Sequence, residues 1–153
     1  MKNKQRHLCR RFCLFIVPCV IGAAFAWFTC KILTAREWEI NVNSMLDISK
    51  VMIGLWGTVL GFIITAESIL IAFDSGSITS EFKKTGHYMT VIFQYTQTSI
   101  KLLITIFALV IISVIGKFSM KIFGIFIWLT LMNFVDVLIS LSILYLMMRM
   151  ASN

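Results

Sequence analysis

The sequence of 153 residues is poor in charge and in proline. Only 14% of its residues are charged, whereas an ordinary soluble domain has about 25%. A single proline leaves long helices almost uninterrupted. Hydrophobic residues make up 59% of the chain, and the mean hydropathy is +0.90. A soluble domain of this size could not bury so much apolar surface, so the composition indicates a membrane protein.

The chain also lacks the patterns of an enzyme or a metal site. The longest polar segment between apolar ones, residues 34–50, leaves no room for a catalytic domain. The two histidines are far apart, and nucleophile-elbow, zinc-protease and phosphate-loop motifs are absent. We therefore expect no catalytic residue, no metal and no cofactor. The cysteines cluster in or beside the first apolar segment, without a second pair to complete a metal site: Cys9, Cys13, Cys19 and Cys30.

Four apolar segments are long enough to cross a bilayer as helices, which takes about 20 residues. They predict an all-α integral membrane protein with about four transmembrane helices in a small bundle. Residues 88–99 are mixed in polarity, so the third span is expected to begin only near their end. The expected spans are about residues 12–33, 51–73, 98–116 and 122–148, which form a single transmembrane domain over residues 12–148.

The distribution of lysine and arginine beside the spans indicates their orientation. Residues 1–11 form a basic tail with five such residues and no acid. With four spans, the N-terminus, the 74–87 loop and the C-terminus share a side that carries nine lysines and arginines, against five on the other side. We therefore expect both termini in the cytoplasm. The net charge of +7 is explained by topology and by the lipid bilayer, and no direct nucleic-acid binding is expected.

A second interpretation of the N-terminal segment stays open. The basic start, the apolar stretch from Phe12 and the Ala-Phe-Ala sequence at 24–26 resemble a cleavable signal peptide. The apolar run continues through Leu33, and the bulky Trp27 follows the supposed cleavage site, which favours a permanent span. Cleavage after residue 26 would leave three spans.

Small residues form a stripe along the second span. At 100° per residue, seven of them fall on one side of this helix. Small residues let membrane helices approach closely, and Gly57 and Gly61 have the four-residue spacing of the shortest such motif. The sequence therefore predicts a closely packed partner helix, either in this chain or in a second copy. The small-residue stripe comprises Gly54, Gly57, Thr58, Gly61, Thr65, Ser68 and Ala72.

Glu67 lies on another side of the same span. An acid within the bilayer should face a partner or water, because a charge in hydrocarbon is costly. Glu67 is about six residues from the cytoplasmic end, and Lys101 enters the third span from the same side at a similar depth. We predict a Glu67–Lys101 pair that stabilises packing or reaches toward the interface. The alternative is that these groups belong to a functional site.

A polar ridge is expected on the fourth span. Its members recur at spacings of three and four and therefore share one side of an otherwise apolar helix. Such a ridge either makes hydrogen bonds to another helix or lines a water-filled path. No lysine is expected at the depth of Asp136, so this carboxyl is expected to have no cationic partner. The ridge comprises Thr130, Asn133, Asp136 and Ser140.

Residues 61–76, GFIITAESILIAFDSG, resemble small bacterial membrane proteins found beside phage-defence genes. The family that this segment resembles is the retron-associated transmembrane effectors, and the resemblance covers about one span and the turn after it. It implies a toxin of the bacterial inner membrane. It also implies a regulator, a reverse transcriptase with its RNA–DNA product, that holds the toxin silent until infection. The released toxin would then damage the membrane and stop growth, which is abortive infection.

The residues and the resemblance together suggest a membrane-disrupting effector that assembles as a homo-oligomer. Three other classes stay open: an immunity-type binding partner of a pore-forming toxin, a holin-like phage lysis protein, and a small transporter that depends on Asp136. In the effector hypothesis the glycines drive assembly and the polar residues line or gate a path, namely Gly54, Gly57 and Gly61 for assembly and Glu67, Asn133 and Asp136 for the path.

Overall fold

Four long helices make up the computed structural model, which describes residues 2–36, 41–72, 87–116 and 119–151. Each of them contains a segment that is long and apolar enough to cross a membrane, and the described residues include no strand. The expected all-α membrane architecture with four helices is therefore confirmed. The helices are α1 (Lys2–Ala35), α2 (Val42–Ala72), α4 (His87–Ile115) and α5 (Met120–Ala151).

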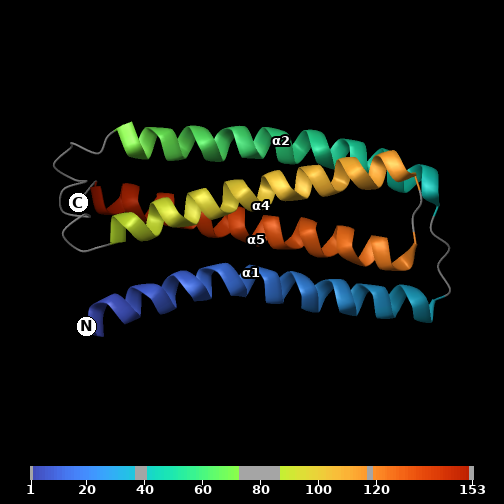
Figure 1. Cartoon of the computed structure of the whole chain (residues 1–153), viewed down its shortest axis with the longest axis horizontal. Coiled ribbons are helices and arrows are strands. Elements are labelled where there is room, and N and C mark those ends of the chain that lie inside the picture. Colours follow the sequence, from blue (N-terminus) through green and yellow to red (C-terminus); the bar gives the residue numbers. More distant parts are fainter. Residues whose placement is uncertain (1, 37–40, 73–86, 117–118, 152–153) are drawn as a thin grey trace.

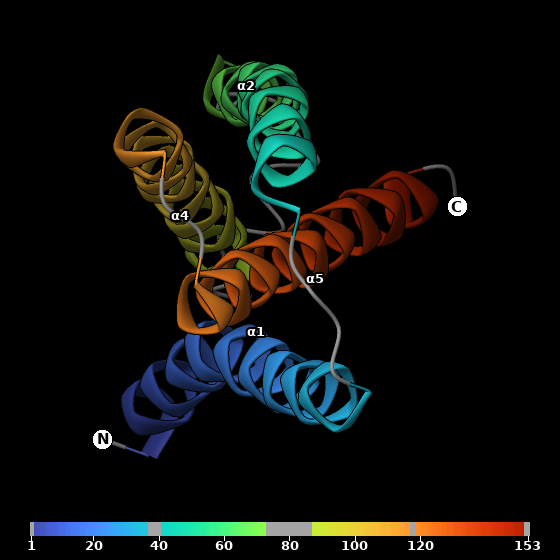
Figure 2. The same cartoon turned by 90° about the vertical axis from the view of Figure 1, so that its right-hand side faces the viewer.

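The helices lie side by side, with α4 and α5 in the middle and α1 and α2 on the outside (Figure 1). α2 packs on α4, α1 packs on α5, and α1 also contacts α4. Seen along the helices, α1 and α2 lie on opposite outer sides of the α4–α5 pair (Figure 2). Each outer helix therefore leaves much of its surface for lipid.

Two helices begin well before the spans expected from hydropathy. α2 starts at Val42 and α4 at His87, because segments of mixed polarity continue the helix before the apolar run begins. The start of α1, the end of α2, the start of α4 and the end of α5 lie at one end of the bundle (Figure 1), as four crossings require. The cytoplasmic location of this end stays a prediction. Almost all of the 74–87 loop lies outside the described residues.

The residues that directly follow α4 and directly precede α5, Gly116 and Ser119, fix where these two helices meet. The Gly116 amide donates to the carbonyl of Ile112 over 3.2 Å, and Gly116 has a φ of +64°, a conformation that favours glycine. Ser119 caps the next helix, because its hydroxyl accepts a hydrogen bond from the Ile122 amide over 3.4 Å. The two helices therefore run antiparallel from this turn.

The apolar core of the bundle lies mainly between α2 and α4. Its two buried α2 residues, Trp56 and Ile63, are seven positions apart and so share one side of the helix. The side of α2 that meets α4 is thus the apolar one. The buried core cluster comprises Trp56, Ile63, Val91, Tyr95, Leu102, Leu109 and Phe126.

Candidate functional site

Polar side chains of α4 meet the polar ridge of α5 in three pairs. Because the helices run antiparallel from the hairpin, residues spaced by three and four on α4 meet residues with the same spacings on α5 in reverse order. All six residues are buried. The pairs are Thr105–Asn133 (Oγ1 to Nδ2, 2.6 Å), Lys101–Asp136 (Nζ to Oδ2, 2.8 Å) and Thr98–Ser140 (Oγ1 to Oγ, 3.2 Å). We call these six residues, with Gln94 and Gln97, the polar seam.

Lys101 is the centre of the polar seam. Its side chain is 7% exposed, and that of its ion-pair partner Asp136 is fully buried. The ammonium also donates to the carbonyl oxygen of Phe15 over 3.3 Å and lies 4.5 Å from the centroid of the Phe15 ring. One charged group of α4 therefore contacts both α1 and α5. A buried charge of this kind is tolerated only because it is paired and hydrogen-bonded.

The proline of α1 leaves a backbone oxygen of this helix free to accept a hydrogen bond from the seam. Pro18 has no N–H, so the carbonyl of Leu14, four residues earlier, has no hydrogen bond within the helix. The Gln97 side chain donates to this Leu14 oxygen over 3.5 Å, and Lys101 donates to that of Phe15. The missing N–H of Pro18 therefore leaves the Leu14 carbonyl as an acceptor for Gln97 on α4.

The seam continues toward the end of the bundle where α4 begins. The Tyr95 hydroxyl donates to the backbone oxygen of Ser140 over 3.0 Å, and the Gln97 amide donates to Gln94 over 2.6 Å. Three buried oxygens of the seam have no hydrogen-bond partner within the described part of the chain. An unsatisfied polar atom is costly in hydrocarbon. Each of these oxygens can accept a hydrogen bond from a donor such as water. They are Gln97 Oε1, Asn133 Oδ1 and Asp136 Oδ1.

The expected Glu67–Lys101 pair is wrong. Glu67 instead accepts a hydrogen bond of 2.5 Å from the Thr96 hydroxyl, and Lys101 pairs with Asp136. The error came from counting the depth of Lys101 from a span that was expected to start near residue 98. Counted from the α4–α5 turn, Lys101 lies 14 residues before the end of α4, and Asp136 lies 16 residues after the start of α5. They are therefore at the same depth, and the expectation that Asp136 has no cationic partner is also wrong.

The small-residue stripe of α2 does not meet another helix among the described residues. A Cβ atom added at Gly54, Gly57 or Gly61 would have no neighbour within 4 Å. Thr65 and Ser68 are exposed, and their hydroxyls donate to carbonyls of their own helix. Of the two partners expected for the stripe, a helix of this chain is thus not found in the described structure. A second copy stays a prediction.

A glycine that the sequence interpretation did not select packs α1 against α5. A Cβ atom added at Gly22 would lie 3.0 Å from the backbone oxygen of Trp128 and 3.1 Å from the amide nitrogen of Met132. Nearby, the Trp128 indole donates to the Cys19 carbonyl over 3.0 Å. The signal was present in the sequence, since Gly22 and the buried Ala26 have the four-residue spacing of close-packing motifs.

No metal site is formed by the described residues, in which no group of three His, Cys, Asp or Glu side chains is close enough to hold an ion. The described cysteines, Cys13, Cys19 and Cys30, are free. No protein-family model, curated protein or solved structure matches the chain. The resemblance to retron-associated effectors therefore stays a prediction, and the function has to be inferred from the polar seam and the small-residue stripe.

Proposed function

We propose that this protein is the toxic effector of a retron-type antiviral system, which disrupts the bacterial inner membrane when its regulator releases it. The observation that carries the proposal is the Lys101–Asp136 pair inside the polar seam. Ionisable groups within membrane helices are expensive and commonly mark ion, proton or water pathways. Four helices that served only as an anchor would not need an ion pair between them.

In this proposal the structure represents the silent state of the effector. The seam side chains of α4 and α5 bond to each other, and α1 adds the Leu14 and Phe15 carbonyls from the side. In the active state, separation of these helices would expose the seam to water and create a polar path through the bilayer. The seam oxygens that have no hydrogen-bond partner support this mechanism, because water can hydrogen-bond to them.

The basic tail provides a route for regulation in this proposal. α1 is one helix from Lys2 to Ala35, so the tail and the Leu14–Phe15 segment belong to the same element. A regulator that holds the tail, such as a reverse transcriptase with its RNA–DNA product, would hold α1 on the seam. Release of the tail would let α1 move, and the donors Gln97 and Lys101 would lose their backbone acceptors.

Assembly through α2 is the second part of the proposal. The small-residue stripe is exposed and has open space around its glycines, so a second copy can reach it. Small residues permit close packing of helices in lipid, where the hydrophobic effect provides no attraction between them. Several copies joined through α2 would place several seams around one axis, which a membrane-disrupting oligomer requires.

Inducible expression in a bacterium without the regulator tests the proposal, with growth and membrane potential followed over time. The wild-type protein should arrest growth and depolarise the membrane. Gly61→Leu and Asp136→Asn should each remove both effects, because they alter the stripe and the seam. Phe62→Leu is the matched control, since Phe62 is 71% exposed and lies outside the stripe. Normal growth and potential with confirmed membrane levels of the wild-type protein would contradict the proposal.

An immunity-type binding partner is the second candidate function, and the exposed stripe of α2 is what favours it. In that case the stripe would receive a helix of a pore-forming toxin rather than a second copy. Expression would then be harmless and would protect cells against one such toxin. Release of cytoplasmic enzymes instead of simple depolarisation would indicate a holin-like lysis protein.

A further inference from the structure

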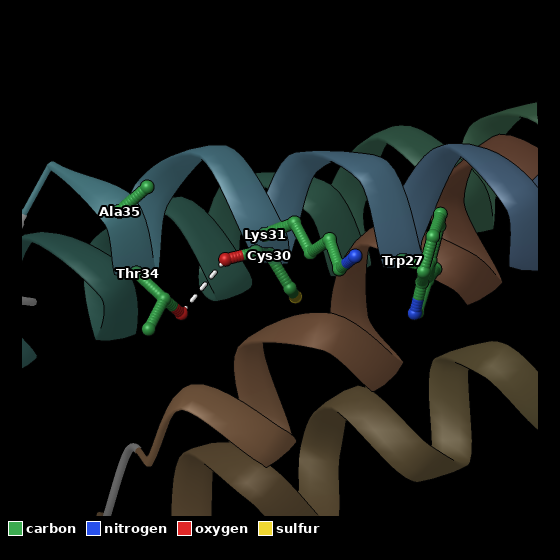
Figure 3. A pocket seen from close by; sticks show the side chains of 5 residues that line it. All are labelled: Trp27, Cys30, Lys31, Thr34 and Ala35. Atoms are coloured by element: carbon green, nitrogen blue, oxygen red, sulfur yellow. Dashed lines mark hydrogen bonds between the residues drawn. The ribbon is translucent and has the colours of Figure 1, made fainter.

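An open hollow lies along the last turns of α1, apart from the polar seam (Figure 3). Its volume is about 490 Å³, and it lies at the end of the apolar Phe12–Ala35 segment. In a membrane this position is the boundary between the hydrocarbon and the lipid headgroups. The lining is mostly apolar and carries one charged group; it comprises Trp27, Cys30, Lys31, Thr34 and Ala35.

Lys31 is turned toward the hollow rather than toward the end of the helix. Its ammonium lies 4.4 Å from the centroid of the Trp27 ring, one turn earlier in α1. Figure 3 shows the lysine side chain running along the helix toward this ring. The other polar group of the lining, the Thr34 hydroxyl, donates to the Cys30 carbonyl over 2.8 Å. Lys31 makes no ion pair with any described residue, so its ammonium keeps donors for an anion.

We propose that this hollow binds an anionic phospholipid, with the phosphate on the Lys31 ammonium and an acyl chain along the apolar lining. The lining residues from Trp27 to Ala35 cover about 12 Å of helix, measured inward from the end of the apolar segment. Tryptophan and lysine are the side chains that anchor proteins at this level of a membrane. A single cation above an apolar wall fits a lipid better than it fits a free anion.

The charges at this end of the bundle support an anionic rather than a zwitterionic headgroup. Arg36 and Lys121 are exposed there, close to the ends of α1 and α5. By sequence this side of the chain carries five lysines and arginines against three acids, Glu37, Glu39 and Asp47. Its net charge is therefore positive, which attracts anionic lipid.

Native mass spectrometry of the purified full chain, titrated with lipid in detergent, tests this inference. Phosphatidylglycerol should bind more tightly than phosphatidylcholine with the same acyl chains. Lys31→Gln should weaken phosphatidylglycerol binding about fivefold, which corresponds to the loss of one basic residue near an anionic surface. Lys121→Gln, the matched control, removes an exposed lysine from the same end but outside the hollow. It should weaken phosphatidylglycerol binding clearly less than Lys31→Gln does, because Lys121 contributes only to the general positive potential of this end.

Other results would overturn the assignment. Equal binding of the two lipids, unchanged binding by Lys31→Gln, or an equal loss in Lys121→Gln would show that the hollow has no headgroup specificity. Displacement of the lipid by millimolar inorganic phosphate would identify a site for free anions instead. Each variant is first compared with the wild-type protein by thermal melting, and because Lys31 is exposed, neither substitution should disturb the fold.

Discussion

Lys101 of α4 and Asp136 of α5 form an ion pair of 2.8 Å with almost no exposure of either side chain. The same lysine contacts the Phe15 carbonyl and ring on α1. One side chain thus links three of the four helices. Any change in the position of one of these helices alters the surroundings of a charge that cannot reach water, which makes this pair the most sensitive point of the bundle.

Removal of one partner of the pair should lower the free energy of unfolding much more than removal of both. Asp136→Asn and Lys101→Met should each lower the free energy of unfolding by about 3–5 kcal/mol, because the other charge stays buried without a partner. The double variant Lys101→Met/Asp136→Asn should lose far less, because no charge is then left without its partner. Denaturant unfolding in detergent measures all three variants. Losses that simply add would show that the two residues stabilise the protein independently.

Glu67→Gln should have little effect in the same assay. Glu67 is only partly buried, and its contact is a hydrogen bond from Thr96, which a glutamine oxygen also accepts. The free energy of unfolding should change by no more than about 1 kcal/mol. A loss as large as that of Asp136→Asn would mean that Glu67 has a charged partner outside the described residues.

The interaction between α1 and Gln97 makes a rescue experiment possible. Gln97→Leu leaves the Leu14 carbonyl without a donor, because Pro18 has no N–H, and should cost about 1 kcal/mol or more. In the Pro18→Ala background, the new amide at position 18 can bond to Leu14, so the same Gln97→Leu change should cost less. A double-mutant cycle by thermal unfolding measures this difference. Equal costs in both backgrounds would exclude the proposed role of Pro18.

The same substitution at two glycines should affect the stability of the monomer differently. Gly22→Leu places a side chain against the α5 backbone and should destabilise the monomer by about 1–3 kcal/mol or displace α1. Gly57→Leu meets open space, so the monomer should keep its stability. Unfolding is measured at a protein concentration that gives monomers. Crosslinking at a higher concentration follows the association of copies. A strong loss of monomer stability in Gly57→Leu would show that the stripe packs within the chain.

The spans and the polar ridge could be predicted because both depend on local periodicity. The partner of Asp136 was missed, because the depth of Lys101 was counted from the expected start of its span near residue 98. Residues 88–99 are mixed in polarity, and hydropathy alone does not assign them to a membrane helix. Counted from the α4–α5 turn instead, Lys101 and Asp136 lie at the same depth. Thr98, Lys101 and Thr105 then fall on the side of α4 that meets the ridge.

The packing glycines show the opposite difficulty. The α2 stripe has three glycines and α1 has one, yet among the described glycines it is Gly22 whose added Cβ would meet the backbone of another helix. Spacing alone indicates that a close contact is sterically possible. It does not indicate whether a neighbouring helix is available to make that contact, because this depends on the order of the helices in the bundle.

The order of the helices has a consequence for how the protein is made. The first two helices leave the ribosome before either has its main partner, since α1 packs on α5 and α2 packs on α4. The charges of Lys101 and Asp136 belong to the last two helices, joined by the turn at Gly116. Insertion of these two helices as a hairpin would let each charge enter the bilayer already neutralised by the other. The mature bundle is therefore completed only when the last part of the chain has been translated.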